Sequence, residues 1–372
     1  MRNAGALMKY RRKLFAAKTM SGRDCPGLLA AAVKENVAYH RAHNPAYRRL
    51  LDGMGFDAAH FDRFSQLPFL TTAFLKGQDL NTKRSFYMAQ SSGTSGKKSA
   101  VSYAPDDLPV LLKTAVHAMA QRGLFSPKPV NYVMLGYRYH RGNQAQTMRT
   151  AYLGTLMAPA LRKRFALEWR DGAYQPRLEG LLEDLVKFSR SSFPCRILGF
   201  PSYLFFLLER MEERQIRLTM PAGSKILLGG GWKQFAQEEV EKAELYRLAR
   251  ERLGIAEEDI VEIFAAVEHP VIYCDCPRHH FHVPAYARVM IRDVHSLKPL
   301  PMGEPGLIHF VSPILKGSPV VSIMTDDIGV LHPGSACGCG DPAPFFTVLG
   351  RAGLSEIKTC VQGANEYAEG QL

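Results

Sequence analysis

Apolar and polar positions repeat at helical spacing in the first part of the chain. Residues 22–52 alternate apolar with basic side chains and end near Gly53 and Gly55. Because glycine disfavours the continuation of a helix, this pattern predicts an N-terminal helical layer over residues 1–66. A hydroxyl- and glycine-rich segment follows, flanked by short apolar stretches, and residues 108–123 return to helical periodicity. We therefore expect a strand, a glycine loop, a strand and a helix in that order.

The middle of the chain alternates between two kinds of apolar pattern. Short continuous apolar runs, which are typical of buried strands, occupy residues 130–136, 195–200 and 225–231. Longer stretches with helical periodicity occupy residues 178–191, 202–216 and 235–254. Strands that alternate with helices predict a mostly parallel α/β sheet, which we assign to residues 67–262.

The pattern changes after about residue 265. In the last part of the chain, short β segments are separated by proline and glycine, at residues 260–268, 282–293, 305–312 and 326–334. Such segments predict a smaller β-rich subdomain over residues 263–350, and residues 351–372 remain as a tail. The predicted fold class is thus α/β, with mostly parallel layered sheets, helices and a second, β-rich subdomain.

Composition is that of an ordinary globular protein. Of 372 residues, 46% are hydrophobic and 22% are charged, which excludes a disordered or fibrous chain. The apolar run from Tyr203 to Leu208 ends at a glutamate, far short of the ~20 residues that cross a bilayer, so we expect no membrane span. The N-terminus lacks the apolar core of a secretory signal, which indicates a cytoplasmic protein.

The net charge of +12 favours an anionic partner. Basic clusters at residues 10–18 and 161–170 carry much of this charge. No helix-turn-helix, zinc-finger or ribonucleoprotein aromatic motif surrounds them. We therefore interpret both clusters as solvated helix faces and expect no nucleic-acid partner. A steep salt dependence of DNA or RNA affinity would instead support nucleic-acid binding.

Four of the seven cysteines form two Cys-x-Cys pairs, and histidines surround the first pair. Thiolates and imidazoles from two separate hairpins can complete a tetrahedral site, which predicts a structural Zn²⁺ ion. The ligands that we favour are Cys276, Cys337 and Cys339. The residues that compete for the fourth position are His282, which we take, Cys274 and His269. Buried free thiols without a metal are the alternative.

The segment at residues 91–98 combines hydroxyls, glycines and lysines. Its backbone N–H groups, hydroxyls and positive charges can surround a polyphosphate. It is not a Walker A loop, because that pattern needs glycine where Ser91 stands and serine or threonine where Lys98 stands. An exposed serine/glycine turn is the alternative interpretation.

The sequence SSGTSGKK in this segment resembles the phosphate-binding loop of the adenylate-forming enzymes, which include acyl-CoA synthetases, firefly luciferase and peptide-synthetase adenylation domains. Four further segments resemble motifs of that superfamily in the same order: LGGGWK at 228–233, FAAVE at 264–268, MTDD at 324–327 and LGRAGLSEIK at 349–358. With GGGWK and the Cys-x-Cys pairs, the chain is most similar to the acyl-protein synthetases of the bacterial bioluminescence fatty-acid reductase system. Phenylacetate–CoA ligases are nearer to it than the long acyl-CoA synthetases.

The resemblance implies a role for each matched residue. The residues that would hold the β- and γ-phosphates of ATP are Ser91, Ser92, Gly93, Thr94, Ser95, Gly96, Lys97 and Lys98. The residues whose backbone would line the adenine are Gly229, Gly230 and Gly231. Glu268 would hold Mg²⁺. Asp327 and Arg351 would bind the ribose hydroxyls, because a carboxylate accepts two hydrogen bonds from a diol.

The chain departs from the superfamily pattern at two residues. Val267 stands where a hydroxyl residue usually contacts the α-phosphate, and Asp326 replaces the glycine before Asp327. The chain also ends about twenty residues after Arg351, so we expect no C-terminal lid domain and no lid lysine. Lys233 is our hypothesis for the positive charge on the α-phosphate.

The resemblance implies ATP-dependent activation of a carboxylic acid, fatty or aryl, to an acyl-adenylate. Cys360 would then accept the acyl group as a thiolate nucleophile, with Lys358 nearby to lower the pKa of the thiol. An acyl reductase or an acyl carrier protein would be the next partner.

Two alternatives remain open. One is an acyl- or aryl-CoA ligase, or a loader of a carrier protein, in which a pantetheine thiol replaces Cys360. The other is a nucleotide-binding module without chemistry, which the departures at Val267 and Asp326 suggest.

Overall fold

The computed structural model describes residues 8–16, 20, 26–57, 60–76, 80–82, 87–90, 99–138, 154–232, 235 and 239–351. The chain forms two compact units. One consists of Met1–His117, Ala265–Tyr273 and His280–Leu372, and the other of Ala118–Phe264 and Cys274–His279. In the described part of the chain, no helix is both long enough and apolar enough to cross a lipid bilayer.

The unit that begins at Ala118 is built on a seven-stranded sheet with the order β10-β9-β8-β7-β4-β5-β6. Its strands are β4 (Val130–Tyr137), β5 (Ala160–Arg170), β6 (Ala173–Pro176), β7 (Cys195–Gly199), β8 (Lys225–Gly229), β9 (Ile260–Phe264) and β10 (Tyr273–Cys274). From β5 through β4, β7 and β8 to β9 the strands pair in parallel, and β6 returns antiparallel to β5. The mostly parallel sheet predicted from the sequence is confirmed.

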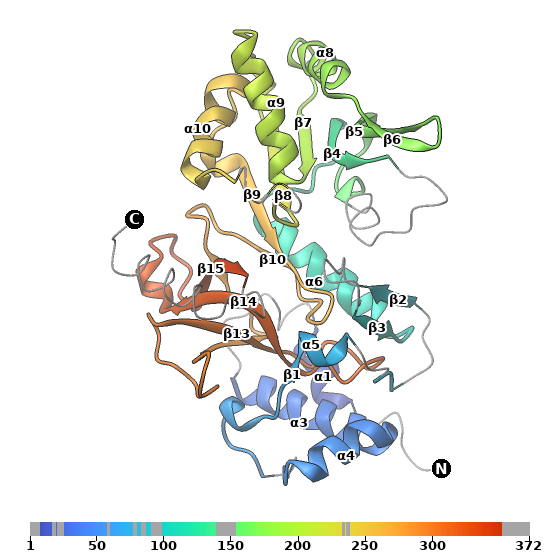
Figure 1. Cartoon of the computed structure of the whole chain (residues 1–372), viewed down its shortest axis with the longest axis vertical. Helices are drawn as coiled ribbons and strands as arrows, with labels where there is room; N and C mark the ends of the chain where they lie inside the picture. Colours follow the sequence, from blue (N-terminus) through green and yellow to red (C-terminus); the bar gives the residue numbers. More distant parts are fainter. Residues whose placement is uncertain are drawn as a thin grey trace. The chain divides into compact units, whose positions relative to one another are not determined.

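Both faces of this sheet are covered. Val133 and Leu135 of β4 pack on one face with three helices, α8 (Leu178–Ser189), α9 (Pro201–Glu213) and α10 (Lys242–Leu253) (Figure 1). Tyr132 and Met134 alternate with them and pack on the other face with Leu124. Because successive side chains of a strand point to opposite faces, a strand that is covered on both faces has a continuous apolar sequence.

Two helix predictions in this unit differ from the structure. The basic cluster at residues 161–170, interpreted as a helix face, belongs to the strand β5. Its backbone pairs with both β4 and β6, and Ala166 and Leu167 are buried, so sheet pairing outweighs the local pattern of charge. The helix predicted over 235–254 begins only at Lys242.

The other unit is built on a six-stranded sheet in the order β11-β15-β14-β13-β12, with β1 paired to β14. Its strands are β1 (Leu70–Thr71), β11 (Phe281–His282), β12 (Arg288–Arg292), β13 (Pro305–Val311), β14 (Ser322–His332) and β15 (Phe345–Arg351). All pairs except β1 with β14 are antiparallel. These strands lie largely in the part of the chain where proline and glycine separate short β segments.

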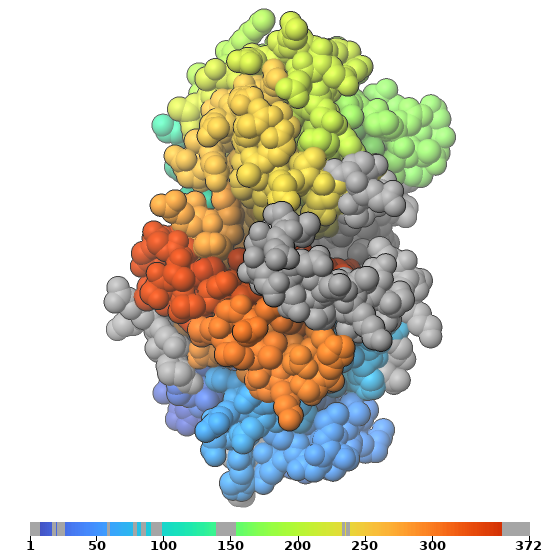
Figure 2. Space-filling view, turned by 60° about the vertical axis from the view of Figure 1, so that its left-hand side comes forward, coloured from blue at the N-terminus to red at the C-terminus, as the bar shows by residue number. Residues whose placement is uncertain are grey.

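Helices of the N-terminal segment belong to the same unit: α1 (Lys9–Leu14), α3 (Pro26–His43), α4 (Pro45–Gly53) and α5 (Thr72–Leu75). Asn44 caps α4, because its side chain accepts a hydrogen bond from the N–H of Tyr47. Figure 2 shows the N-terminal segment (blue) beside the segment that contains β12 (orange). There, Arg292 Nη2 donates a hydrogen bond to the carbonyl of Ser65 at 2.9 Å.

Candidate functional site

A hairpin flanks the glycine-rich segment. β2 (Tyr87–Gln90) precedes the segment, β3 (Ala100–Tyr103) follows it, and α6 (Leu108–Gln121) comes next. The two strands pair antiparallel, with Gln90 opposite Ala100. Residues 91–98 themselves lie outside the described residues. The strands and the helix occur in the predicted order, and the pairing places Gln90 and Ala100, one on each side of the segment, opposite each other.

Glu268 is a carboxylate without a protein partner in the described residues. Its relative exposure is 5%, and within the described ranges no hydrogen-bond donor or cation contacts it. Leaving a buried carboxylate without a cation costs roughly 3–5 kcal/mol. Such a group is suited to a cationic ligand, and carboxylate oxygens are among the ligands that Mg²⁺ prefers.

Asp327 and Arg351 face each other on neighbouring strands. They are register partners in the β14–β15 ladder, and Arg351 Nε lies 4.0 Å from Asp327 Oδ1. Burial raises the pKa of Asp327 above its usual value, and the positive charge of Arg351 opposes this rise. Because the ion pair is long and the arginine side chain is 60% exposed, the carboxylate keeps the capacity to accept hydrogen bonds from a ligand such as a diol.

Electrostatic coupling links Glu268 to two other segments of the same unit. Burial is the main reason why the pKa values of Asp327 on β14 and Tyr103 on β3 are raised, and the negative charge of Glu268 contributes to both. Interactions between side-chain charges weaken with distance, so this coupling indicates proximity. The negative charge of Glu268 thus acts on both Asp327 and Tyr103, which ends the strand after residues 91–98.

Asp326, which replaces a glycine of the superfamily pattern, has partners of its own. Thr72 Oγ1 donates a hydrogen bond to its Oδ1 at 2.6 Å, and Lys76 Nζ lies 3.6 Å from its Oδ2. Both partners lie on or directly after α5. Because successive side chains of a strand point to opposite faces, these contacts leave the neighbouring Asp327 available. No sequence pattern indicated Thr72, which is 254 residues away from its partner.

Three of the residues predicted to bind the nucleotide lie in the unit that begins at Ala118. Gly229 ends the strand β8, and Gly230 and Gly231 follow it with φ values of 85° and 65°, in the left-handed region that favours glycine. In parallel sheets, ligands bind outside the carboxyl ends of the strands. Lys233 and Cys360 both lie outside the described residues.

Cys276, His282, Cys337 and Cys339 form a group of potential metal ligands. Their ligand atoms all lie within 4.8 Å of one another. His282 Nε2 is 3.2 Å from the sulfur of Cys337 and 3.2 Å from the sulfur of Cys339. Three thiolates and one imidazole are a known ligand set of tetrahedral zinc sites.

The orientation of His282 suits metal binding. Its Nδ1 lies 2.8 Å from the backbone carbonyl of Ala343, which accepts a hydrogen bond and so leaves Nε2 without a proton in the neutral ring. His269 and Cys274, the two other candidates for the fourth ligand, do not belong to this group. His269 Nε2 is 2.9 Å from the hydroxyl of Tyr273.

Known proteins resemble this chain in sequence over most of its length. The family model described as "Acyl-protein synthetase, LuxE" matches residues 19–368. The long-chain-fatty-acid–luciferin-component ligase of Vibrio harveyi is 24% identical over 309 residues, which cover 82% of this chain and 79% of that protein. The phenylacetate-coenzyme A ligase of Thermus thermophilus is 24% identical over 366 residues, which cover 94% of this chain and 75% of that protein.

Solved structures resemble this chain in fold. The crystal structure of 2-hydroxyisobutyryl-CoA ligase in the postadenylation state, in complex with 2-HIB-AMP, has a TM-score of 0.66 at 15% identity and covers 94% of this chain and 72% of that one. An open conformation of the same ligase in complex with 2-HIB-AMP and CoA has a TM-score of 0.65 at 14% identity and covers 87% and 69%. The predicted fold class is therefore confirmed.

Proposed function

The chain belongs to the LuxE family of acyl-protein synthetases and is an adenylate-forming ligase, and on that premise we propose that it activates a fatty or aryl acid and transfers the acyl group to a protein thiol. The carboxylate of the acid attacks the α-phosphorus of ATP, pyrophosphate leaves, and an acyl-adenylate remains. The thiolate of Cys360 then attacks the acyl carbonyl, AMP leaves, and a thioester forms. The first step needs no general base, because a carboxylate is ionised at neutral pH.

The roles proposed for these residues are to bind ATP and to neutralise its charge, rather than to transfer protons. Residues 91–98 hold the β- and γ-phosphates, residues 229–231 line the adenine, and Asp327 and Arg351 bind the ribose hydroxyls. Glu268 holds Mg²⁺, which neutralises the negative charge that develops as the phosphoanhydride bond breaks. Positioning of the acid and ATP supplies much of the remaining acceleration.

The buried carboxylate of Glu268, which has no partner among the described residues and whose charge acts on Asp327, carries this proposal. The test is carboxylate-dependent exchange of pyrophosphate into ATP, measured with a panel of fatty and aryl acids. Exchange with at least one acid is expected. Binding of ATP without exchange for any acid would contradict the proposal and support a nucleotide-binding module without chemistry.

A CoA ligase is the second candidate, and the similarity to a phenylacetate-coenzyme A ligase favours it. In that case a free pantetheine thiol, rather than Cys360, attacks the adenylate. Supplying CoA together with an active acid separates the two. Acyl-CoA that accumulates supports the ligase alternative, whereas an acyl group bound to the protein supports self-acylation, with an acyl reductase or acyl carrier protein as the next acceptor.

Lys233→Ala is expected to slow adenylate formation at saturating ATP by roughly 100-fold, because Lys233 is proposed to supply positive charge at the α-phosphate. The measurement is single-turnover release of pyrophosphate. Lys242→Ala is the matched control, since Lys242 is exposed and paired with Glu262 at 2.6 Å. An unchanged rate in Lys233→Ala would exclude the role.

We further propose that Cys276, His282, Cys337 and Cys339 hold a structural Zn²⁺ ion. Purified protein is expected to contain about one zinc ion per chain. Cys337→Ser should lose the metal and unfold at a lower temperature, because the free energy of metal binding contributes to folding.

Elemental analysis and thermal denaturation, with and without a chelator, measure both effects. Cys274→Ser is the matched control and should keep its zinc, since Cys274 lies outside the group of four. Full zinc content in Cys337→Ser and Cys339→Ser would overturn the site.

A further inference from the structure

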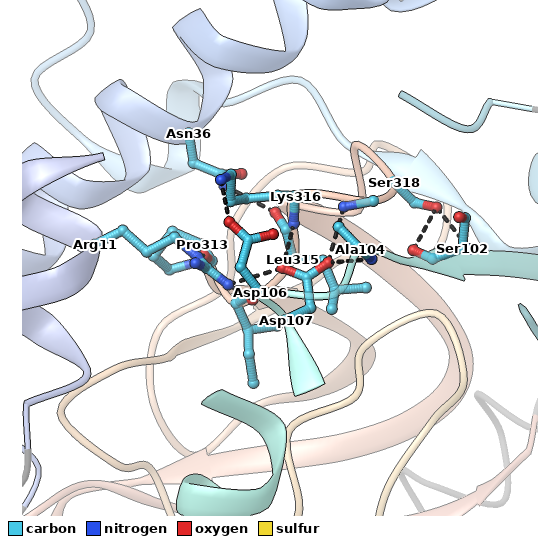
Figure 3. Close-up of polar contacts among 12 residues, drawn as sticks. Arg11, Asn36, Ser102, Ala104, Asp106, Asp107, Pro313, Leu315, Lys316 and Ser318 are labelled. Carbon is cyan, nitrogen blue, oxygen red and sulfur yellow. Dashed lines mark hydrogen bonds and ion pairs between the residues drawn. The ribbon is translucent and has the colours of Figure 1, made fainter. Parts of the chain in front are cut away.

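The loop between β13 and β14 is buried although it has no regular secondary structure. A buried loop needs partners for its backbone N–H and C=O groups. Arg11 of α1 donates a hydrogen bond from Nε to the carbonyl of Pro313 at 3.0 Å and from Nη2 to the carbonyl of Ile314 at 2.6 Å (Figure 3). Asn36 of α3 donates from Nδ2 to the carbonyl of Leu315 at 2.9 Å. The N-terminal helices therefore satisfy the carbonyl groups of this loop.

Asp107 satisfies the N–H groups of the same loop. Its side chain is fully buried. Oδ1 accepts hydrogen bonds from the backbone N–H of Lys316 at 2.9 Å and from Arg11 Nη2 at 2.8 Å. Oδ2 accepts from the backbone N–H of Gly317 and of Ala104, each at 2.9 Å. One carboxylate thus joins α1, the loop and the residues that follow β3.

The loop in turn fixes the strand β3. The backbone N–H of Ser102 in β3 donates to Ser318 Oγ at 2.8 Å (Figure 3). Gly317 lies so close to β3 that a Cβ atom at this position would be 2.2 Å from the carbonyl oxygen of Ser102. Because backbone atoms cannot move aside cheaply, only glycine fits at this contact between the loop and β3.

We propose that Arg11 and Asp107 are positioning residues for ATP binding, an inference that rests on the proposed function. The strand that they fix through the loop directly follows residues 91–98, to which we assign the phosphates. The same strand ends at Tyr103, which is electrostatically coupled to Glu268. The ion pair therefore holds β3 in place, and its loss is expected to weaken the binding of Mg·ATP.

Asp107→Asn keeps the size of the side chain but replaces one oxygen acceptor with an NH₂ donor. The amide cannot serve all four donors that the carboxylate accepts, so the loop and β3 are expected to shift. We expect the Kd for Mg·ATP, measured by isothermal titration calorimetry, to rise roughly 10- to 100-fold. A role confined to stability would lower the unfolding temperature and leave the Kd of the folded protein unchanged.

Ser318→Ala is a second variant, and it tests the proposal even where Asp107→Asn fails to fold. It removes a hydroxyl that accepts a hydrogen bond from the Ser102 N–H at 2.8 Å and donates one to Asn81 Oδ1 at 2.8 Å. Its Kd for Mg·ATP should rise in the same direction by a smaller factor. The matched control is Asp52→Asn, which breaks the ion pair between Arg41 and Asp52 at 2.7 Å on α3 and α4. That pair is about half exposed, so the Kd should not change.

Two failures can be told apart. An unchanged Kd in folded Asp107→Asn, or in Ser318→Ala, would overturn the positioning role while wild-type exchange activity stands. Wild-type protein that binds Mg·ATP but shows no exchange with any acid would overturn the proposed function instead. Wild-type protein that does not bind Mg·ATP would overturn both.

Discussion

Glu268→Gln is expected to lower carboxylate-dependent ATP–pyrophosphate exchange by roughly 10²- to 10³-fold. Glutamine keeps the size of the side chain but removes the charge proposed to hold Mg²⁺ at the phosphates. The unfolding temperature should stay the same or rise, because a charge without a partner among the described residues disappears from a side chain of 5% relative exposure. Exchange assays and calorimetry measure the two effects, and their opposite directions separate a functional loss from misfolding.

Glu304→Gln is the matched control for this experiment. Glu304 is an exposed carboxylate just before β13 in the same unit, so its replacement should leave both exchange and stability unchanged. Partial rescue of Glu268→Gln by a higher Mg²⁺ concentration would support the metal-binding role. Exchange at the wild-type rate in Glu268→Gln would remove Glu268 from the site.

Cys360→Ser is expected to abolish the covalent acyl adduct while leaving ATP–pyrophosphate exchange at the wild-type rate. Formation of the adenylate needs no thiol, but its breakdown by the protein needs a thiolate, and a serine hydroxyl without a base is a poor nucleophile. The measurement is incubation with labelled acid and ATP, followed by denaturation, with and without hydroxylamine. Label that hydroxylamine releases from wild-type protein should be missing from the variant.

Cys25→Ser is the control, because it also removes one isolated cysteine and should retain the adduct. A hydroxylamine-sensitive adduct that persists in Cys360→Ser would show that another thiol carries the acyl group. Loss of exchange together with the adduct would show that the substitution damages the adenylation step, which would also contradict the assignment.

The strands that are buried on both faces could be predicted from the sequence alone. The continuous apolar runs at residues 130–136, 195–200 and 225–231 correspond to β4, β7 and β8. A strand that is covered on both faces carries mostly apolar side chains, so its burial shows in its local composition. By the same reasoning β5 was hard to predict. Part of this strand is exposed and carries charged side chains, and it is a strand because it pairs with its neighbours.

Polar contacts between distant segments were beyond the reach of the sequence. Arg11 and Asp107 are 96 residues apart, and nothing in the local pattern around either shows that they form a buried ion pair. The same holds for Thr72, the partner of Asp326. Such pairs depend on the tertiary fold, whereas helices and strands leave a periodic signal in the residues that form them.

The candidate zinc site could be predicted from the sequence only in part. Two Cys-x-Cys pairs near histidines were enough to propose a metal, since thiolates in hairpins have a characteristic spacing. The fourth ligand was not determined, because His282, Cys274 and His269 are all near Cys276 in the sequence. The carbonyl of Ala343, which orients the ring of His282, is a backbone group that no sequence pattern reveals.

The proposed function requires that the glycine-rich segment, Glu268 and Asp327 bind a single Mg·ATP. A crystal structure of the protein with Mg²⁺ and a non-hydrolysable ATP analogue tests it most directly. We expect the metal on the carboxylate of Glu268, the ribose hydroxyls on Asp327, and the β- and γ-phosphates on residues 91–98. A nucleotide bound elsewhere, or a metal held without Glu268, would contradict it.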